Sequence, residues 1–306
     1  MRLVFCGTAA FAVPSLRVCA THHDVLAVIT RADRVGSRGK PAPRPVADAA
    51  RELGLAVLMP ARIGAPEVVR DLLGLTPDCL VVAAYGQILP TSLLDPPAFG
   101  AVNVHASLLP RWRGASPIAN AILAGDAETG VSIMRMEAGL DTGPVYATVR
   151  CPIADDATTP ALTAALADLG AAELVSVLDA LERGSATATA QPEEGVTYAP
   201  RLGREDGRVD WAGRSAVEVD RMVRALQPWP GVMAPIDGVD VQVQAGGAVS
   251  VDSGAAPGGI AGREGESVVI ATRDGGYRVD RITPPGKRAM TPAAWLRGRR
   301  SGVGDS

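Results

Sequence analysis

One short apolar run, AVNVHAS at residues 101–107, carries two polar side chains that are suited to stabilising negative charge. The run is typical of a β-strand, and it contains one of only 3 histidines in the chain. Side chains two positions apart on a strand point to the same face, so we expect Asn103 and His105 to lie side by side. An amide and an imidazole in this arrangement can hydrogen-bond the oxygen of a carbonyl that is under attack by a nucleophile.

A third polar residue, Asp141, follows a second strand-like segment, TGVSIMRME at residues 129–137. Loops that follow adjacent strands can converge, so we expect the Asp141 carboxylate to orient the His105 ring and to stabilise its protonated form. Ser107 is close in sequence but lies outside a G-x-S-x-G elbow, which leaves attack by the substrate's own amine or by water. A structural alternative is equally open at this point, with His105 as an ordinary core histidine and with Asn103 and Asp141 as turn residues.

The composition indicates a globular protein with room for more than one domain. Of the 306 residues, 47% are hydrophobic, and the mean hydropathy is +0.15. We find no apolar run near the roughly 20 residues that span a bilayer, and the N-terminus lacks the layout of a signal peptide. The 4 cysteines are too scattered for a zinc site or a disulfide framework, which predicts reduced thiols, no metal and a cytoplasmic location. Without a large apolar surface stripe, we expect a monomer with no membrane contact.

Charge is distributed unevenly along the chain. The net charge of −3 argues against a general nucleic-acid binder, but residues 207–306 hold 13 basic and 11 acidic residues, whereas residues 1–206 hold 17 and 22. Basic residues gather at 273–300, with eight against two aspartates, and at 31–44, with five against one. Each run is most simply a solvated surface, although the pair also fits a polyanionic partner held at defined places. The segment RWRG, residues 111–114, offers a basic and stacking phosphate contact, or else surface arginines beside a half-buried tryptophan.

The first half of the chain alternates short apolar runs with helix-like patterns. The runs lie at residues 2–7, 24–30, 56–60, 78–85 and 101–107, and the helical patterns at 11–22, 45–54 and 65–75. This alternation predicts an α/β fold with a Rossmann-like, mostly parallel sheet flanked by helices, in which ligands bind beyond the carboxyl ends of the strands. A helix over 116–125 and a long amphipathic helix from Thr159 to about Gly184 follow.

The second half changes in character after a polar, proline-bearing stretch at residues 185–207. A helical pattern over 215–226 is followed by short alternating strands with glycine turns, at residues 239–244, 248–253, 267–272 and 277–283. These predict a small antiparallel, OB-like β-barrel. We therefore divide the chain into a catalytic domain at 1–188, a linker at 189–206 and a C-terminal barrel domain at 207–306.

Several motifs in this order resemble one enzyme family. NVHASLLPRWRGASPI at residues 103–118 and GDAETGVSIMRMEAGLDTGPV at 125–145 closely resemble the formyltransferases that use 10-formyltetrahydrofolate. The fuller pattern, with FCGTAAFA at 5–12 and RALQPWPG at 224–231, is similar to the branch that acts on methionyl-tRNA. The resemblance implies formylation of the methionine α-amine on initiator tRNA, with the folate as formyl donor and no metal.

The same resemblance implies a role for individual residues. Asn103 and His105 would stabilise the tetrahedral intermediate, and Asp141 would set the charge state of His105 and help to move protons. The folate would lie against two stretches, Ser107, Leu108, Leu109 and Pro110 in one and Tyr85, Gln87 and Ile88 in the other. The tRNA would contact Arg34, Arg38 and Lys40 in a loop and Lys287 and Arg288 in the barrel, mostly through its phosphates.

Other functions stay open as alternatives. A formyltransferase that acts on an amino sugar nucleotide would share the three catalytic residues but would need no basic face for tRNA. A deformylating hydrolase would use the same residues to activate water, and a non-enzymatic RNA-binding protein would need none of them. A nicotinamide dehydrogenase is the default for this fold class, but the turn after the first strand lacks the G-x-G-x-x-G fingerprint.

Overall fold

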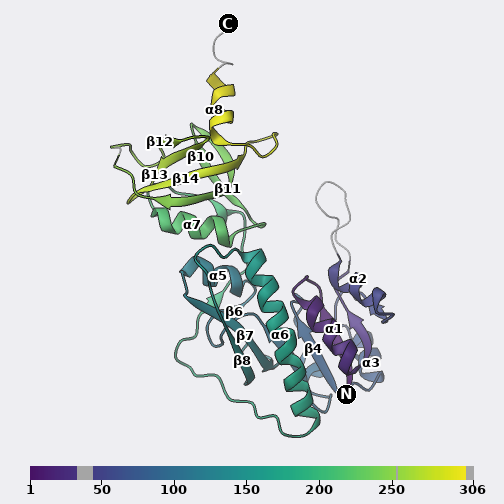
Figure 1. Cartoon of the computed structure of the whole chain (residues 1–306). Helices are drawn as coiled ribbons and strands as arrows, with labels where there is room; N and C mark the ends of the chain where they lie inside the picture. Colours follow the sequence, from purple (N-terminus) through teal and green to yellow (C-terminus); the bar gives the residue numbers. More distant parts are fainter. Residues whose placement is uncertain (33–43, 253, 301–306) are drawn as a thin grey trace. The chain divides into compact units, whose positions relative to one another are not determined.

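The computed structural model describes residues 1–32, 44–252 and 254–300, and the chain forms two compact units (Figure 1). Unit 1 comprises Met1–Ile118, Ala127–Ile153 and Ala161–Pro200. Unit 2 comprises the short segments Ala119–Asp126 and Ala154–Pro160 together with Arg201–Ser306. The proposed catalytic residues all belong to unit 1.

Unit 1 is built on a seven-stranded sheet with the strand order β3-β2-β1-β4-β5-β7-β8. The strands are β1 (Arg2–Gly7), β2 (Asp24–Ile29), β3 (Val57–Leu58), β4 (Cys79–Ala83), β5 (Ala101–His105), β7 (Glu128–Arg135) and β8 (Val145–Pro152). The first five strands in this order are parallel, whereas β7 is antiparallel to β5 and β8 is antiparallel to β7. The predicted mostly parallel sheet is confirmed, and the unpredicted β8 lies at its edge, where none of its residues is fully buried.

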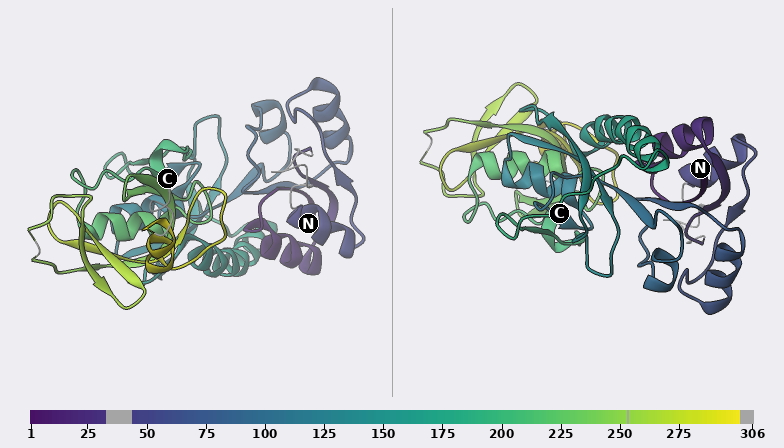
Figure 2. Two further views of the ribbon diagram at one scale, coloured as in Figure 1. Left: turned by 90° about the horizontal axis from the view of Figure 1, so that it is seen from above. Right: turned by 90° about the horizontal axis from the view of Figure 1, so that it is seen from below.

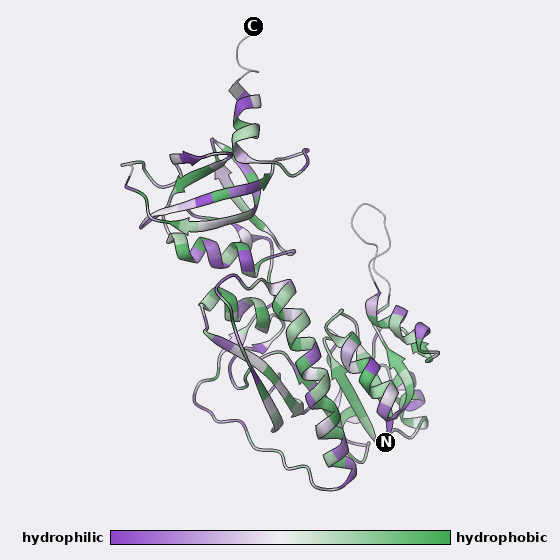
Figure 3. Cartoon of the chain, in the orientation of Figure 1, coloured by the Kyte–Doolittle hydropathy of each residue, from purple (hydrophilic) through white to green (hydrophobic). Residues whose placement is uncertain are grey.

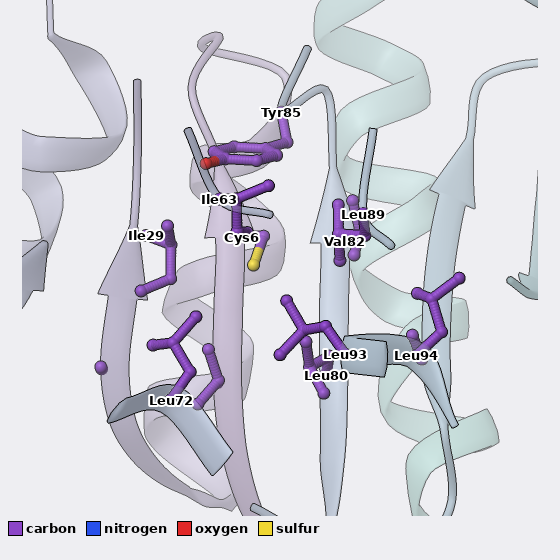
Figure 4. Close-up of a cluster of buried hydrophobic side chains, with 13 residues drawn as sticks. Cys6, Ile29, Ile63, Leu72, Leu80, Val82, Tyr85, Leu89, Leu93 and Leu94 are labelled. Carbon is purple, nitrogen blue, oxygen red and sulfur yellow. The ribbon is translucent and has the colours of Figure 1, made fainter. Parts of the chain in front are cut away.

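Helices cover both faces of this sheet (Figures 1 and 2). They are α1 (Ala12–His22), α2 (Pro45–Glu52), α3 (Pro66–Gly74), α4 (Thr91–Leu94) and α6 (Thr159–Glu182), whereas most of α5 (Pro117–Ala124) belongs to unit 2. Helices α3 and α4 lie on the face that carries Cys6 and Val82, where their leucines form a closed apolar cluster with the strands (Figure 4). Helix α6 lies on the opposite face, where Gly170 approaches Val104 and Val131 so closely that a Cβ would lie 2.8 Å and 3.1 Å from their methyl groups.

The 24-residue helix α6 corrects one sequence expectation. It is long and apolar enough to cross a membrane by length and composition alone, with a mean hydropathy of 1.6 in its most apolar window. Its leucines recur with helical spacing, and Leu166, Leu174 and Leu178 are fully buried within the protein. The apolar stripe of α6 therefore serves the core of unit 1.

Strand β5 is buried along its whole length, as expected for a strand in the middle of a parallel sheet. Colouring by hydropathy shows the apolar strands between helices whose outer faces are polar (Figure 3). Val82 on β4 is in register with Asn103 on β5, so Asn103 and His105 lie on the face of α3 and α4. Val102 and Val104 point the other way, toward α6, and this alternation fixes the face on which the polar pair lies.

A segment that follows α6, residues 187–199, runs back along unit 1 and is referred to below as the strap. Thr189 forms a β-bridge with Val145 at the edge of the large sheet. Further along, β9 (Tyr198–Ala199) pairs in parallel with β6 (Arg113–Gly114) in a separate two-stranded sheet. The strap lies within the stretch 189–206 that the sequence predicts as a linker, and the chain belongs to unit 1 as far as Pro200.

Unit 2 contains a five-stranded antiparallel sheet in the order β10-β11-β14-β13-β12, as predicted for the barrel-like domain. Its strands are β10 (Val232–Ile236), β11 (Val239–Val249), β12 (Ile260–Glu264), β13 (Ser267–Ala271) and β14 (Gly276–Thr283), and its helices are α7 (Ala216–Ala225) and α8 (Pro292–Arg300). A short 3₁₀ helix, η2 (Glu205–Gly207), precedes α7. Ser215 and Glu218 form a capping box that starts α7.

The first predicted strand of unit 2 (239–244) and the start of the second (248–253) belong to one long strand in the structure, β11. The glycine pair Gly246–Gly247 was expected to turn the chain, but it lies within β11, beside irregularities in the pairing with β14 around Ala245. Gly246 packs so closely on the partner strand that a Cβ would lie 2.1 Å from the Arg278 carbonyl oxygen. Glycine here permits a bulge and a close approach of two backbones, which the sequence pattern alone does not separate from a turn.

Candidate active site

The last residues of β5 place an amide and an imidazole on one face of the sheet, at the carboxyl end of the strand. Asn103 is 9% exposed and His105 is 5% exposed. Among the residues that the structure describes, the Asn103 side chain forms no hydrogen bond. The amide atoms of Asn103 are not among the fully buried polar atoms that lack a partner, so they reach solvent and are open to an incoming polar group.

Both ring nitrogens of His105 face a polar group of the protein. Nε2 lies 3.0 Å from the carbonyl oxygen of Trp112, and Nδ1 lies 3.7 Å from Oδ2 of Asp141. Because a carbonyl can only accept, the contact with Trp112 assigns the proton of the neutral ring to Nε2. Nδ1 then faces the carboxylate of Asp141.

The loop that carries Asp141 reaches His105 by a different route from the predicted one. Strand β7 is antiparallel to β5, so its last residue, Arg135, pairs with Val102 near the start of β5. The loop that follows then runs back toward the carboxyl end of β5, and Asp141 itself has a left-handed backbone with φ of 50°. Asp141 therefore meets His105 because a loop returns, and not because two parallel strands end together.

Two glycines allow the loops around Asp141 to approach each other. Gly114 donates its backbone N–H to Oδ2 of Asp141 over 2.8 Å, and its φ of 119° is open to glycine alone. A Cβ at Gly114 would lie 2.7 Å from the Ala199 carbonyl oxygen, and one at Gly143 would lie 2.0 Å from that of Arg135. The glycines of RWRG and LDTG thus have a steric reason to be there.

Three residues that the sequence analysis left out of the site contact it directly. Gln191 donates from Nε2 to the carbonyl oxygens of Asp141 and Gly143, both over 2.8 Å. Arg113 is buried, at 9% exposure, and donates from Nε and Nη2 to Oε1 of Gln191 over 3.0 and 2.7 Å. Thr197 accepts the backbone N–H of Trp112 on its hydroxyl over 2.9 Å.

The predicted surface or phosphate-binding role of Arg113 is wrong, because its guanidinium lies inside the protein and is engaged by Gln191. Arg111 does stack on the Trp112 ring, 4.3 Å from its centre. The only sequence signal for Arg113 is its place two residues after Arg111 in a motif with a tryptophan. Gln191 and Thr197 lie in a polar stretch that carries no periodicity, so nothing in their surroundings marks them.

The first predicted folate-binding stretch forms a tight turn directly after β5. Ser107 is buried and donates its hydroxyl to the Arg111 carbonyl over 2.6 Å, while Ser132 donates to the Ser107 carbonyl over 2.8 Å. Leu108, Leu109 and Pro110 are half-buried. An open hollow of about 280 Å³ lies beside this turn, lined among others by Leu109, Tyr146, Thr148 and Gln191.

The second predicted folate-binding stretch follows β4, and its three residues differ in exposure. Tyr85 is buried in the apolar cluster of Figure 4, and burial raises the pKa of its phenol well above the usual range. Gln87 accepts the backbone N–H of Ile63 over 3.0 Å. Ile88 is 89% exposed, which is unusual for so large an apolar side chain.

The predicted tRNA-binding residues fall into two groups. Arg34, Arg38 and Lys40 lie outside the described residues. Lys287 and Arg288 are exposed and, within the described ranges, have no ion-pair partner. The remaining basic side chains of 273–300 that the structure describes are mostly paired with acids: Arg273 with Glu218, Arg278 with Asp280, Arg297 with Glu266 and Arg299 with Asp237.

Two buried cysteines, Cys6 and Cys79, lie in the sheet that carries these residues. Burial raises the pKa of Cys6 and of Cys79 to about 12, so both thiols stay protonated and unreactive. In the part of the chain that the structure describes, no group of three or more His, Cys, Asp or Glu side chains is placed to hold a metal ion.

Comparison with known proteins gives a consistent result over the whole chain. Residues 1–178 match the formyl transferase family and residues 201–300 match the formyl transferase C-terminal domain. A methionyl-tRNA formyltransferase of Paracoccus denitrificans is 47% identical over 299 residues, covering 97% of both chains. One from Rhodococcus erythropolis is 44% identical, covering 98% of this chain and 97% of the relative.

Solved structures with the same fold are more distant. HypX from Aquifex aeolicus matches with a TM-score of 0.68 at 19% identity over 100% of this chain, which spans about half of HypX (49%). An N-formyltransferase from Helicobacter canadensis, solved with folinic acid and dTDP-3-aminofucose, matches with a TM-score of 0.67 at 17% identity, covering 90% of this chain and 97% of that one.

Proposed function

This chain belongs to the methionyl-tRNA formyltransferase family, and we propose that Asn103, His105 and Asp141 carry the reaction of that family in it. The reaction transfers the formyl group of 10-formyltetrahydrofolate to the α-amine of methionine on initiator tRNA. A new bond forms between the amine nitrogen and the formyl carbon, and the bond from that carbon to N10 of the folate breaks. The amine loses one proton and N10 gains one.

The three side chains suit the charge changes of this reaction. The Asn103 amide, which has no partner within the described ranges, donates a hydrogen bond to the formyl oxygen as that oxygen becomes negative. The imidazole of His105 adds positive charge beside the same oxygen when it is protonated. Asp141 stabilises that protonated ring from 3.7 Å. Because Nε2 faces the Trp112 carbonyl, the proton that passes from the amine to N10 would be held at Nδ1, on the side of Asp141.

The observation that carries the proposal is the pairing of His105 with Asp141 beside an unpartnered, nearly buried amide. A core histidine satisfied by its neighbours would need neither a carboxylate on its second nitrogen nor a free amide two residues away. The arrangement fits attack by an amine supplied by the substrate.

We also propose the binding residues that the family resemblance implies. Ser107, Leu108, Leu109, Pro110, Tyr85, Gln87 and Ile88 would form the folate site. The turn after β5 and the exposed Ile88 support contact, whereas the hydrogen bonds of Ser107 and Gln87 to backbone groups support a shaping role. Arg34, Arg38, Lys40, Lys287 and Arg288 would bind the tRNA, with exposed, unpaired cations at Lys287 and Arg288 in support.

The division of labour between the parts of the chain is proposed on the same basis. Residues 1–188 would form the catalytic domain and 207–306 the tRNA-binding domain, and the linker between them, 189–206, would begin with the strap that pairs with unit 1. A monomer in the cytoplasm, without membrane contact, fits an enzyme that acts on tRNA.

A substrate panel tests the proposal. The chain is incubated with 10-formyltetrahydrofolate and methionyl-initiator tRNA, free methionine, an amino sugar nucleotide or buffer alone, as wild type and as Asn103→Ala. We expect formyl-methionyl-tRNA from the wild type. The variant should form it at a rate lower by about 100-fold or more, since removal of one oxyanion donor costs at least about that factor. Equal rates for the two proteins would refute the role of Asn103. Formylation of the amino sugar nucleotide without formylation of methionyl-tRNA would refute the proposed substrate.

A further inference from the structure

We propose that Gln191 is a positioning residue that holds the backbone of Asp141 so that its carboxylate faces His105. The inference rests on the proposed function, because it requires Asp141 to act in the reaction. No pattern in the sequence marks Gln191, which lies in the strap, far from the catalytic motifs along the chain.

The amide of Gln191 is fully engaged in one orientation. Its two N–H groups donate to the carbonyl oxygens of Asp141 and Gly143, and its oxygen accepts two N–H groups from Arg113. A flipped amide would place its oxygen against two carbonyl oxygens and its NH2 group against a guanidinium. The four contacts therefore allow only one orientation of the side chain.

These contacts close a ring around Asp141. Gly114 donates its N–H to the carboxylate, and Arg113, the preceding residue, donates its guanidinium to Gln191. Gln191 in turn donates to the backbone carbonyl of Asp141. The side chain and the main chain of Asp141 are thus both tied to one short segment, β6.

The strap itself is anchored on either side of Gln191. Two residues before it, Thr189 is bridged to Val145. Six residues after it, Thr197 accepts the N–H of Trp112 and its carbonyl accepts the N–H of Arg113. The backbone on both sides of Gln191 is therefore held in place. Its hydrogen bonds can then hold the loop that contains Asp141 and Gly143 in position.

The backbone of Asp141 has an uncommon conformation that the contacts of Gln191 help to hold. Its φ of 50° lies in the left-handed region, which is uncommon for residues other than glycine, although aspartate tolerates it better than most, and contacts from the surroundings stabilise it there. Loss of the two hydrogen bonds from Gln191 lets the turn at 141–143 relax and takes the carboxylate away from His105. A misplacement of about 1 Å in a catalytic group lowers the rate by up to about 100-fold.

The test uses Gln191→Met, which keeps the length and removes all four contacts, and Gln191→Glu, which puts a carboxylate against the two carbonyls. We expect kcat for formylation to fall about 10-fold to 100-fold in both, with KM for tRNA and for folate within about 2-fold of wild type. A rise in KM with unchanged kcat would overturn the inference, because it would make Gln191 a substrate contact at the hollow that it lines.

Arg2 supplies the matched control. It donates from Nη1 to the carbonyl oxygen of Thr76, which like Asp141 has a left-handed backbone, but it lies at the amino end of β1, outside the proposed site. Arg2→Met removes the same kind of contact and should leave kcat within about 2-fold of wild type. A loss of kcat equal to that of Gln191→Met would overturn the inference, because the effect would then be a general one on folding.

The double variant Asp141→Asn/Gln191→Met separates this inference from the proposed function. If Gln191 acts through Asp141, its substitution costs little more once the carboxylate is gone, whereas independent effects multiply. A full multiplicative loss in the double variant would refute positioning through Asp141. If Asp141→Asn alone leaves kcat unchanged, the proposed function itself fails, whatever Gln191 does.

Discussion

Substituting Asp141 by asparagine removes one charge and keeps the shape of the site. The Asn carbonyl oxygen can still accept the N–H of Gly114, as Oδ2 of Asp141 does over 2.8 Å. What is lost is the attraction between the carboxylate and a protonated His105 at 3.7 Å. Coulomb's law gives about 4.5 kcal/mol for that distance at an effective dielectric constant of about 20, and about 1 kcal/mol in water.

The Asp141 side chain is 16% exposed, so the effect lies between these limits and toward the buried one. A loss of about 3 kcal/mol in the transition state corresponds to a kcat about 100-fold lower. The assay is formylation of methionyl-tRNA at saturating folate, across pH 6 to 9, with thermal unfolding as a check on the fold. Asp95→Asn, an exposed carboxylate after α4, is the control and should leave kcat unchanged. If Asp141→Asn retains kcat within about 2-fold of wild type across this range, the assigned role of the carboxylate is wrong.

Three further outcomes concern stability and binding. Burial lowers the pKa of His23, whose ring nitrogens find no hydrogen-bond partner within the described ranges, so the unfolded chain binds a proton more readily than the folded one. The free energy of unfolding then decreases as pH falls below about 6.5. Urea unfolding at pH 7 and at pH 5 measures this decrease, which should be smaller for His23→Leu than for wild type or for the control His22→Gln. Ser215→Ala removes the cap of α7 and should lower the free energy of unfolding by about 1 kcal/mol, with an unchanged urea midpoint as the contrary result. Lys287→Ala and Arg288→Ala should each raise KM for tRNA and reduce the slope of log affinity against log salt by about 1, and an unchanged slope would exclude a phosphate contact.

The chemistry-bearing face of β5 could be predicted because it follows from strand periodicity. A strand buried on both faces has few positions for polar side chains, so Asn103 and His105 stand out in an otherwise apolar run. The parallel core of the sheet follows in the same way from apolar runs that alternate with helices. In each case the prediction depends on residues that are close in sequence, and it does not require knowledge of which distant segments come into contact.

The rest of the site depends on contacts between segments that are distant in sequence. The direction of β7 is not encoded in its alternation, which is the same for a parallel and an antiparallel strand, so the path of Asp141 to His105 was predicted for the wrong reason. Arg113 resembles any surface arginine until its partner Gln191 is known, 78 residues away. Gly246–Gly247 permits a turn or a bulge equally, and the pairing of β11 with β14 decides between them.

The central claim is that His105, with Asn103 and Asp141, performs formyl transfer. A single-turnover experiment tests it most directly: enzyme in excess over methionyl-initiator tRNA, at saturating 10-formyltetrahydrofolate, with wild type and His105→Gln compared by the rate at which formyl-methionyl-tRNA appears. The account predicts product formation by the wild type, a rate at least about 100-fold lower for the variant, and tRNA binding unchanged between them. Equal single-turnover rates in the two proteins would contradict it.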